Sequence, residues 1–156
     1  MRWIPRLAGI LVLLALPAHA GHSPPKVLFR VFIQTSGEGL PASEAQEVTI
    51  PPNHEMIMVR AMPEITEQNL VDVHADASGN VHFLLDHAGQ VNLDAVTGED
   101  QGRIMVVTLN GFVIYAPLID TQITNGELIV PHTIDPVIIK LLEDEAQKNV
   151  REAHKA

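Results

Sequence analysis

Two histidines and two aspartates near the middle of the chain are spaced so that they could bind a metal ion. Asp72, His74 and Asp76 alternate along one predicted strand, and His82 lies on the next. A three-residue loop between these strands would place His74 opposite His82, with the aspartates on the same outward face. Two imidazoles and a carboxylate are ligands that zinc and copper accept. Two ligands on adjacent strands rarely suffice, and we interpret these histidines as polar residues on a solvated face of the sheet. We therefore predict no bound metal or cofactor, and we keep His74 and His82 as the metal candidates.

Other reactive side chains do not form a catalytic pattern. His54-Glu55 begins like a metalloprotease helix, but Met58 stands where the second histidine is required. The acidic run 143–145 is typical of a helix surface. The absence of cysteine excludes thiol catalysis and thiolate metal sites. Four serines lie in predicted loops outside any nucleophile-elbow pattern, at Ser23, Ser36, Ser43 and Ser78. We predict no catalytic residue and no enzymatic activity.

The first twenty residues have the three parts of a secretory signal peptide. Arg2 and Arg6 give a positive start, residues 10–17 an apolar middle, and Ala18-His19-Ala20 a cleavage site. The apolar run is about a dozen residues, shorter than the ~20 that a spanning helix needs. We expect a signal peptide over residues 1–20, a flexible leader over 21–26, and an exported chain, periplasmic or extracellular, with no transmembrane segment after cleavage.

Cleavage would leave a strongly acidic chain. Residues 21–156 carry 8 Lys and Arg against 19 Asp and Glu, a net charge of −11. Such a chain repels phosphate backbones and anionic lipid, which excludes nucleic acid and membrane surfaces as partners. Its length fits one domain, and we expect residues 27–153 to form one compact unit.

The expected secondary structure begins with N-terminal strands over residues 27–61. Residues 26–35 alternate as a strand whose buried face carries Val27, Phe29, Val31 and Ile33. Two shorter strands, 47–50 and 56–62, lie on either side of Pro51-Pro52.

The stretch 103–131 predicts the middle of an antiparallel sheet. Asn110-Gly111 is a strong hairpin signal, and a two-residue loop there would place Val107 opposite Ile114. A second Asn-Gly pair precedes a third strand, 127–130. The turns and one tyrosine are candidates for a protein-contact surface: Asn110, Gly111, Tyr115, Asn125 and Gly126.

Two helices complete the predicted fold. Asp86 is a plausible N-cap for a helix to about residue 100 that turns Val91 and Ala95 inward, with Val96 or Leu93 as a further inward residue. Asp135 and Pro136 begin an amphipathic helix to about residue 153, with Val137 among its inward residues. The fold class is α+β, a mainly antiparallel sheet with two helices on one face and additional N-terminal strands.

Four segments, in this order, resemble the head subdomain of the first periplasmic domain of SecD, an accessory protein of the Sec translocon. They are VHFLLDHAG, DAVTGEDQG, RIMVVTLNGFVIYAPLI and ITNGELIV. The matching positions are Leu85 with Gly89, Thr97 with Gly102, and Leu109-Asn110-Gly111 through Ala116-Pro117. The resemblance covers about residues 62–142 and predicts a head-like domain over 62–153. The chain departs from the family in two ways. SecD proteins are polytopic, which is not predicted here. In SecD a Gly and an aromatic residue usually stand between the last strand and the following helix, and residues 131–134 occupy that place in this sequence.

The resemblance implies the fold, an extracytoplasmic setting and contact with exported polypeptide, but not proton-driven translocation. The leading hypothesis is an exported, non-enzymatic module of the cell envelope that binds protein or polypeptide and is linked to secretion. One alternative is a periplasmic metal-binding or hydrolytic protein that uses His74 and His82. Another is a purely structural domain of an envelope assembly.

Overall fold

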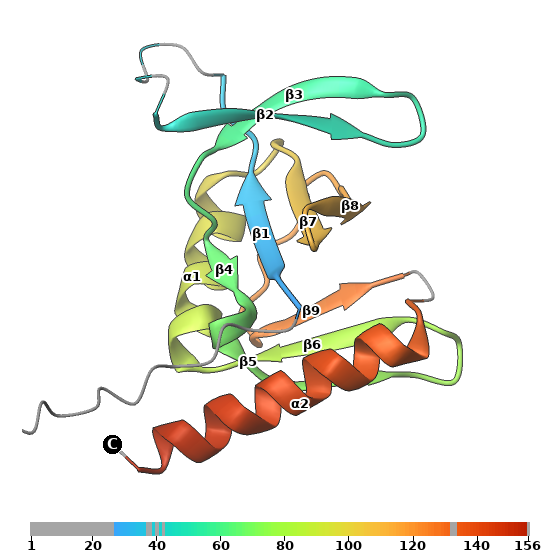
Figure 1. The fold of residues 1–156 in the computed structure, drawn as a ribbon. Helices are drawn as coiled ribbons and strands as arrows, with labels where there is room; N and C mark the ends of the chain where they lie inside the picture. The colour runs from blue at the N-terminus through green and yellow to red at the C-terminus, as the bar shows by residue number, and fades with distance from the viewer. Residues whose placement is uncertain (1–26, 37–38, 40, 42, 132–133, 156) are drawn as a thin grey trace, which may run out of the picture.

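The computed structural model describes residues 27–36, 39, 41, 43–131 and 134–155. The expected signal peptide and leader, residues 1–26, lie outside the described residues. Within them the chain forms nine strands, two α-helices and one short 3₁₀ helix (Figure 1). The predicted α+β class is confirmed, and so are the additional N-terminal strands.

The strands form three antiparallel sheets. The first has the order β4 (Ile65–Thr66), β1 (Phe29–Ile33), β7 (Met105–Leu109), β8 (Phe112–Tyr115). The second pairs β2 (Ala45–Ile50) with β3 (Glu55–Arg60). The third has the order β5 (Leu70–Ala75), β6 (Val81–Leu85), β9 (Glu127–Val130). The stretch 103–131 is therefore divided between two sheets, because β9 pairs with β6 and not with the β7–β8 hairpin.

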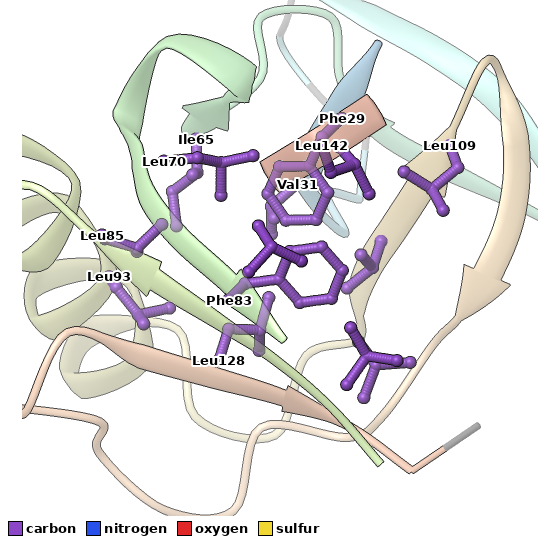
Figure 2. Packing of buried hydrophobic residues seen from close by; sticks show 14 of the residues in the cluster. Phe29, Val31, Ile65, Leu70, Phe83, Leu85, Leu93, Leu109, Leu128 and Leu142 are labelled. Carbon is purple, nitrogen blue, oxygen red and sulfur yellow. The ribbon is translucent and has the colours of Figure 1, made fainter. Parts of the chain in front are cut away.

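The main core lies between the four-stranded and the three-stranded sheet. Phe29 of β1 and Phe83 of β6 stack with ring centroids 4.5 Å apart, and both are fully buried (Figure 2). Leu128 of β9 and Leu142 of the C-terminal helix belong to the same cluster. The predicted buried face of the first strand is confirmed, since Val27, Phe29, Val31 and Ile33 are each at most 1% exposed.

A second, smaller core covers the other face of the four-stranded sheet. Phe32 of β1 and Val106 of β7 pack there against Ile57 and Val59 of the β2–β3 hairpin. Figure 1 shows this hairpin across one end of the molecule and the three-stranded sheet at the other. Strands β1 and β7 are thus covered on both faces, whereas β8 forms an edge.

The predicted inward face of helix α1 (His87–Glu99) is confirmed in part. Its N-cap is Asp86, as predicted, whose carboxylate accepts a hydrogen bond from the Gly89 N–H at 2.7 Å. The buried side chains include Leu93 and Val96, while Val91 is 51% exposed. A Cβ on Gly89 would lie within 3.0 Å of the Cβ atoms of Asn69 and Leu85, so a larger residue would not fit at this position without a shift of its neighbours. Ala95, also expected inward, is exposed.

Helix α2 (Pro136–Ala153) begins at the predicted N-cap, Asp135, whose carboxylate accepts a hydrogen bond from the Val137 N–H at 2.8 Å. Leu142 and Ala146 are fully buried, and the helix packs along β5 and the 3₁₀ helix η1 (Glu67–Asn69). Val137 is 67% exposed, contrary to its predicted inward position. It lies in the first turn, before the fully buried positions of the helix.

The turns form as predicted, but bulges shift the pairing. Asn110 and Gly111 have φ values of 51° and 84°, as the hairpin turn requires. Val107 pairs with Tyr115 and not with Ile114, because an irregularity follows it in the ladder. In the β5–β6 hairpin His74 pairs with His82, as the three-residue loop predicts.

Candidate functional site

The histidine cluster lies on the face of the three-stranded sheet that points away from the main core. The rings of His74 on β5 and His82 on β6 stack with centroids 5.0 Å apart and planes inclined by 4°. The Asp72 carboxylate accepts a hydrogen bond from Nδ1 of His74 at 2.8 Å. The structure thus brings the predicted pair together with the predicted aspartates.

Carboxylates flank the ring of His82 on both sides. Its Nδ1 lies 2.7 Å from Oε1 of Glu127 on β9, and its Nε2 lies 3.4 Å from Oδ2 of Asp76. The hydrogen bond to Glu127 raises the pKa of His82 above its ordinary value. Hydrogen bonds from Asn80, above all from its side chain, lower the pKa of Asp76 to about 2. The cluster connects β5, β6 and β9 by charge-assisted bonds.

This geometry is poorly suited to a metal ion. Parallel, stacked imidazoles do not aim their nitrogens at one point, and Nδ1 of both His74 and His82 already faces a carboxylate. Across the described residues, no three His, Cys, Asp or Glu side chains are grouped so that they could hold a metal ion. The arrangement acts chemically as a titratable network on a sheet surface.

A groove of about 510 Å³ lies between the end of β8 and strand β9, and Glu127 of the histidine cluster is among its lining residues. The segment from Pro117 to Asn125 forms much of its lining, with Tyr115 and Leu128 from the strands. A hydrogen bond from the Ile123 N–H to Oγ1 of Thr97 on α1, 2.9 Å long, holds this segment. Leu118 lines the groove and is 60% exposed, so the groove presents an apolar side chain to solvent.

Two further hollows lie on either side of β8. One, of about 410 Å³, lies between the β2–β3 hairpin and residues 111–113; it is lined by Glu47, Val48, Thr49, Pro51, His54, Gly111, Phe112 and Val113. The other, of about 520 Å³, lies between the β7–β8 hairpin and the start of α2; it is lined by Leu109, Asn110, Phe112, Ile114, Ile134, Asp135 and Ile138. Phe112 lines both and is 77% exposed. We call β8 together with the groove and these two hollows the β8 surface.

The β8 surface is acidic. The charged carboxylate residues that line it are Glu47, Asp120, Glu127 and Asp135, and none of the described lining residues is a lysine or arginine. Asp120 and Glu47 are exposed. A cationic ligand is therefore favoured over an anionic one.

The predicted contact residues are distributed over this surface. Tyr115 and Asn125 line the groove, whereas Gly111 and Asn110 each line one of the smaller hollows. Asn110 also serves the fold, since its side chain accepts a hydrogen bond from the Leu28 N–H at 2.9 Å. Gly126 lies against the side chain of Gln90. The sequence analysis missed Phe112 and Leu118, whose signal was an apolar residue next to a turn or a proline.

Together these features define a small α+β domain with a hollowed, acidic surface around an edge strand. A family model, the P1 head subdomain of SecDF, matches residues 43–133, more than half of the chain, and the chain belongs to this family. The resemblance to the SecD head is confirmed. No curated protein matches the chain.

Two solved structures are similar to the chain. One is a crystal structure of SecDF in a super-membrane-facing form, with 18% identity over 78% of this chain and a TM-score of 0.55. The other is a structure of SecDF, described as a membrane component that enhances protein export, with 17% identity, the same coverage and the same TM-score. The chain spans 18% of the first protein and 62% of the second. At this identity the likeness shows the fold. Neither helix in the described part of the chain has the length and apolarity that a membrane crossing requires.

Proposed function

We propose that this protein is an exported, non-enzymatic module of the cell envelope that binds unfolded polypeptide and takes part in protein secretion. The observation that carries the proposal is the hollowed β8 surface on a SecDF P1 head fold. Membership of that family links the chain to protein secretion. The sequence adds a predicted signal peptide over residues 1–20, which supports an extracytoplasmic setting.

The groove has the physical properties that polypeptide binding needs. Extended chains without a fixed sequence are bound through apolar contacts and backbone hydrogen bonds, and a shallow apolar groove beside a strand offers both. Leu118 and Ile129 are exposed at 60% and 44%, and both line the groove. Large apolar side chains exposed together on a small acidic protein indicate an interaction surface.

Site-specific photo-crosslinking tests the proposal. A photoreactive amino acid replaces Leu118 in the groove, and the protein is mixed with a reduced, carboxymethylated polypeptide that cannot fold. The matched control carries the same group at Val91, which is 51% exposed on α1, away from the groove. We expect several-fold more crosslinked product from position 118. Equal yields, or none from either position, would refute polypeptide binding at this surface.

Export is tested separately. The full chain with a C-terminal tag is expressed, and the cells are fractionated. We expect a shortened product outside the cytoplasm, whose N-terminal sequence begins near Gly21. A full-length product in the cytoplasm would contradict the proposed setting.

A further inference from the structure

We infer that β8 binds an extended polypeptide segment with alternating apolar and basic residues, which adds to the four-stranded sheet as a further strand. This inference rests on the proposed function and specifies its binding mode and its ligand. It concerns the outer edge of β8 at Val113, whereas polypeptide binding through the groove alone would need no strand pairing.

The outer edge of β8 carries no charged residue and no proline, although the strand has four residues and a bulge interrupts its pairing with β7 beyond Val113. Natural edges carry charges, prolines or bulges, or are very short. β8 ends the sheet order β4-β1-β7-β8, and its sequence, FVIY, has no charge and high β-propensity. The other edge strands among the described residues are protected. β2, β3, β5 and β9 each contain charged residues, and β4 has two residues.

The pairing with β7 leaves backbone groups of β8 directed outward. Across a two-residue turn, Leu109 and Phe112 form the hydrogen-bonded pair next to Asn110-Gly111. Hydrogen-bonded and non-hydrogen-bonded pairs alternate along an antiparallel ladder, so the N–H and C=O of Val113 point away from β7. A further strand would pair with these groups.

The hollows on the two sides of β8 explain why the ligand alternates. Successive side chains of an added strand point to opposite faces of the sheet. One face meets the hollow toward α2, whose lining is mostly apolar; its one carboxylate residue, Asp135, caps α2 through the Val137 N–H. The other face meets the hollow toward the β2–β3 hairpin, whose lining includes the exposed Glu47 together with Thr49 and His54. Apolar side chains fit the first hollow, and basic side chains fit the second.

Charge also excludes a second copy of this chain as the occupant. The full sequence has a net charge of −9, and the residues that line the β8 surface are acidic as well. Two copies paired along β8 would bring like charges together, which disfavours association. Pro117 follows the strand closely, so pairing involves a short segment and we expect fast, reversible binding.

The test uses a capped eight-residue peptide of alternating lysine and valine, with the full-length protein. Two isomers carry N-methyl groups, one on every valine and the other on every lysine. The N–H groups of alternate residues point to opposite sides of a strand, so one isomer loses its bonds to β8 and the other keeps them. We expect one isomer to bind about tenfold more weakly than the unmethylated peptide and the other to bind like it.

Two controls complete the design. Glu47→Gln removes an acidic residue from the hollow toward β2–β3 and should weaken the peptide severalfold, while Glu55→Gln, an exposed acid of the same hairpin that lines none of the hollows, should not. Saturating peptide should also slow amide hydrogen exchange at Val113.

The outcomes separate the inference from the proposed function. Equal affinities of the two N-methyl isomers, or no binding of the peptide, would overturn strand addition at β8. Crosslinking from position 118 would then show whether the protein still binds polypeptide through the groove. Sedimentation that shows a dimer without peptide, with Val113 protected in that dimer, also overturns the inference in favour of a second copy.

Discussion

At the scale of single residues, His82 is the clearest titratable feature of the protein. It lies between Glu127 and Asp76 and stacks on His74, which is itself bonded to Asp72. Three carboxylates therefore surround two imidazoles on this sheet surface. Among the described residues, no lysine or arginine is bonded to these carboxylates. Protonated imidazole satisfies these carboxylates best, so the cluster favours the charged form of His82.

Stability should depend on pH through His82. Its pKa is raised in the folded protein, so its contribution to the free energy of unfolding is complete below the unfolded value of about 6.5 and is lost as the pH rises through the folded pKa. We expect urea unfolding to show a loss of stability as the pH rises above about 6.5. His82→Gln and Glu127→Gln should each reduce that loss. An unchanged pH profile in both variants would contradict this assignment.

Asp76 acts in the opposite direction. Its folded pKa of about 2 lies below the unfolded value, so its contribution is present above about pH 4 and is lost as the pH falls toward 2. The two residues together place the most stable range of this cluster between about pH 4 and about pH 6.5.

At the scale of elements, the β7–β8 turn depends on a single backbone conformation. Gly111 has a φ of 84°, and a Cβ there would meet no atom within 4 Å. The cost of a substitution is therefore conformational and not steric. Gly111→Ala should lower the free energy of unfolding by about 1 to 2 kcal/mol. Gly111→Asn should cost less, because asparagine tolerates the left-handed region. Denaturant titration compares them, and an equal cost for both would contradict the backbone explanation.

The sequence predicted elements better than their pairing. Asn-Gly turns, N-caps and alternation are local signals, and they correctly predicted the hairpins, both helix starts and the buried face of β1. The β-bulges in the β5–β6 and β7–β8 ladders depend on contacts with other elements. The bulge in the β7–β8 ladder makes Tyr115 the partner of Val107 in place of the predicted Ile114. For α1 the sequence offered both the exposed pair, Val91 and Ala95, and the buried pair, Leu93 and Val96, because periodicity alone did not decide which face packs inward.

The histidine pair and the β8 surface differ in how well the sequence revealed them. His74 and His82 could be placed opposite each other from one loop length, because they lie on consecutive strands. The hollows join residues that are distant in sequence, such as Glu47 with Val113 and Leu109 with Ile138. Such a surface requires the order of strands in the sheets, which alternation alone does not provide.

At the scale of the whole molecule, one core joins two sheets and two helices, so we expect residues 27–153 to unfold as a unit. Leu142 of α2 is fully buried in that core. Leu142→Ala should lower the free energy of unfolding by about 2 to 5 kcal/mol. Val137→Ala, on an exposed position of the same helix, should change it by less than about 0.5 kcal/mol.

Circular dichroism and the fluorescence of Tyr115 should report one coincident transition for wild type and for both variants. Two separate transitions, or a similar small effect of both substitutions, would show that α2 is not part of the cooperative unit.

The region that the family model matches is smaller than this unit. Residues 43–133 omit β1 and α2. Yet β1 lies between β4 and β7 and contributes to both cores, and α2 supplies Leu142 to the larger one. A recombinant fragment limited to the matched residues would therefore lack an inner strand, and we expect it not to fold.

The inner position of β1 also determines when the four-stranded sheet can form during synthesis of the chain. β1 is the first described strand to leave the ribosome, but Phe29 pairs with Leu109 and Ile33 pairs with Met105, late in the chain. Contacts so far apart in sequence form slowly, because a long loop must close before they stabilise anything. The four-stranded sheet therefore cannot be completed until Tyr115, the last residue of β8, has been synthesised. Until then the side chains of β1 lack their partners on β7, and we expect this sheet to form only after most of the chain has been made.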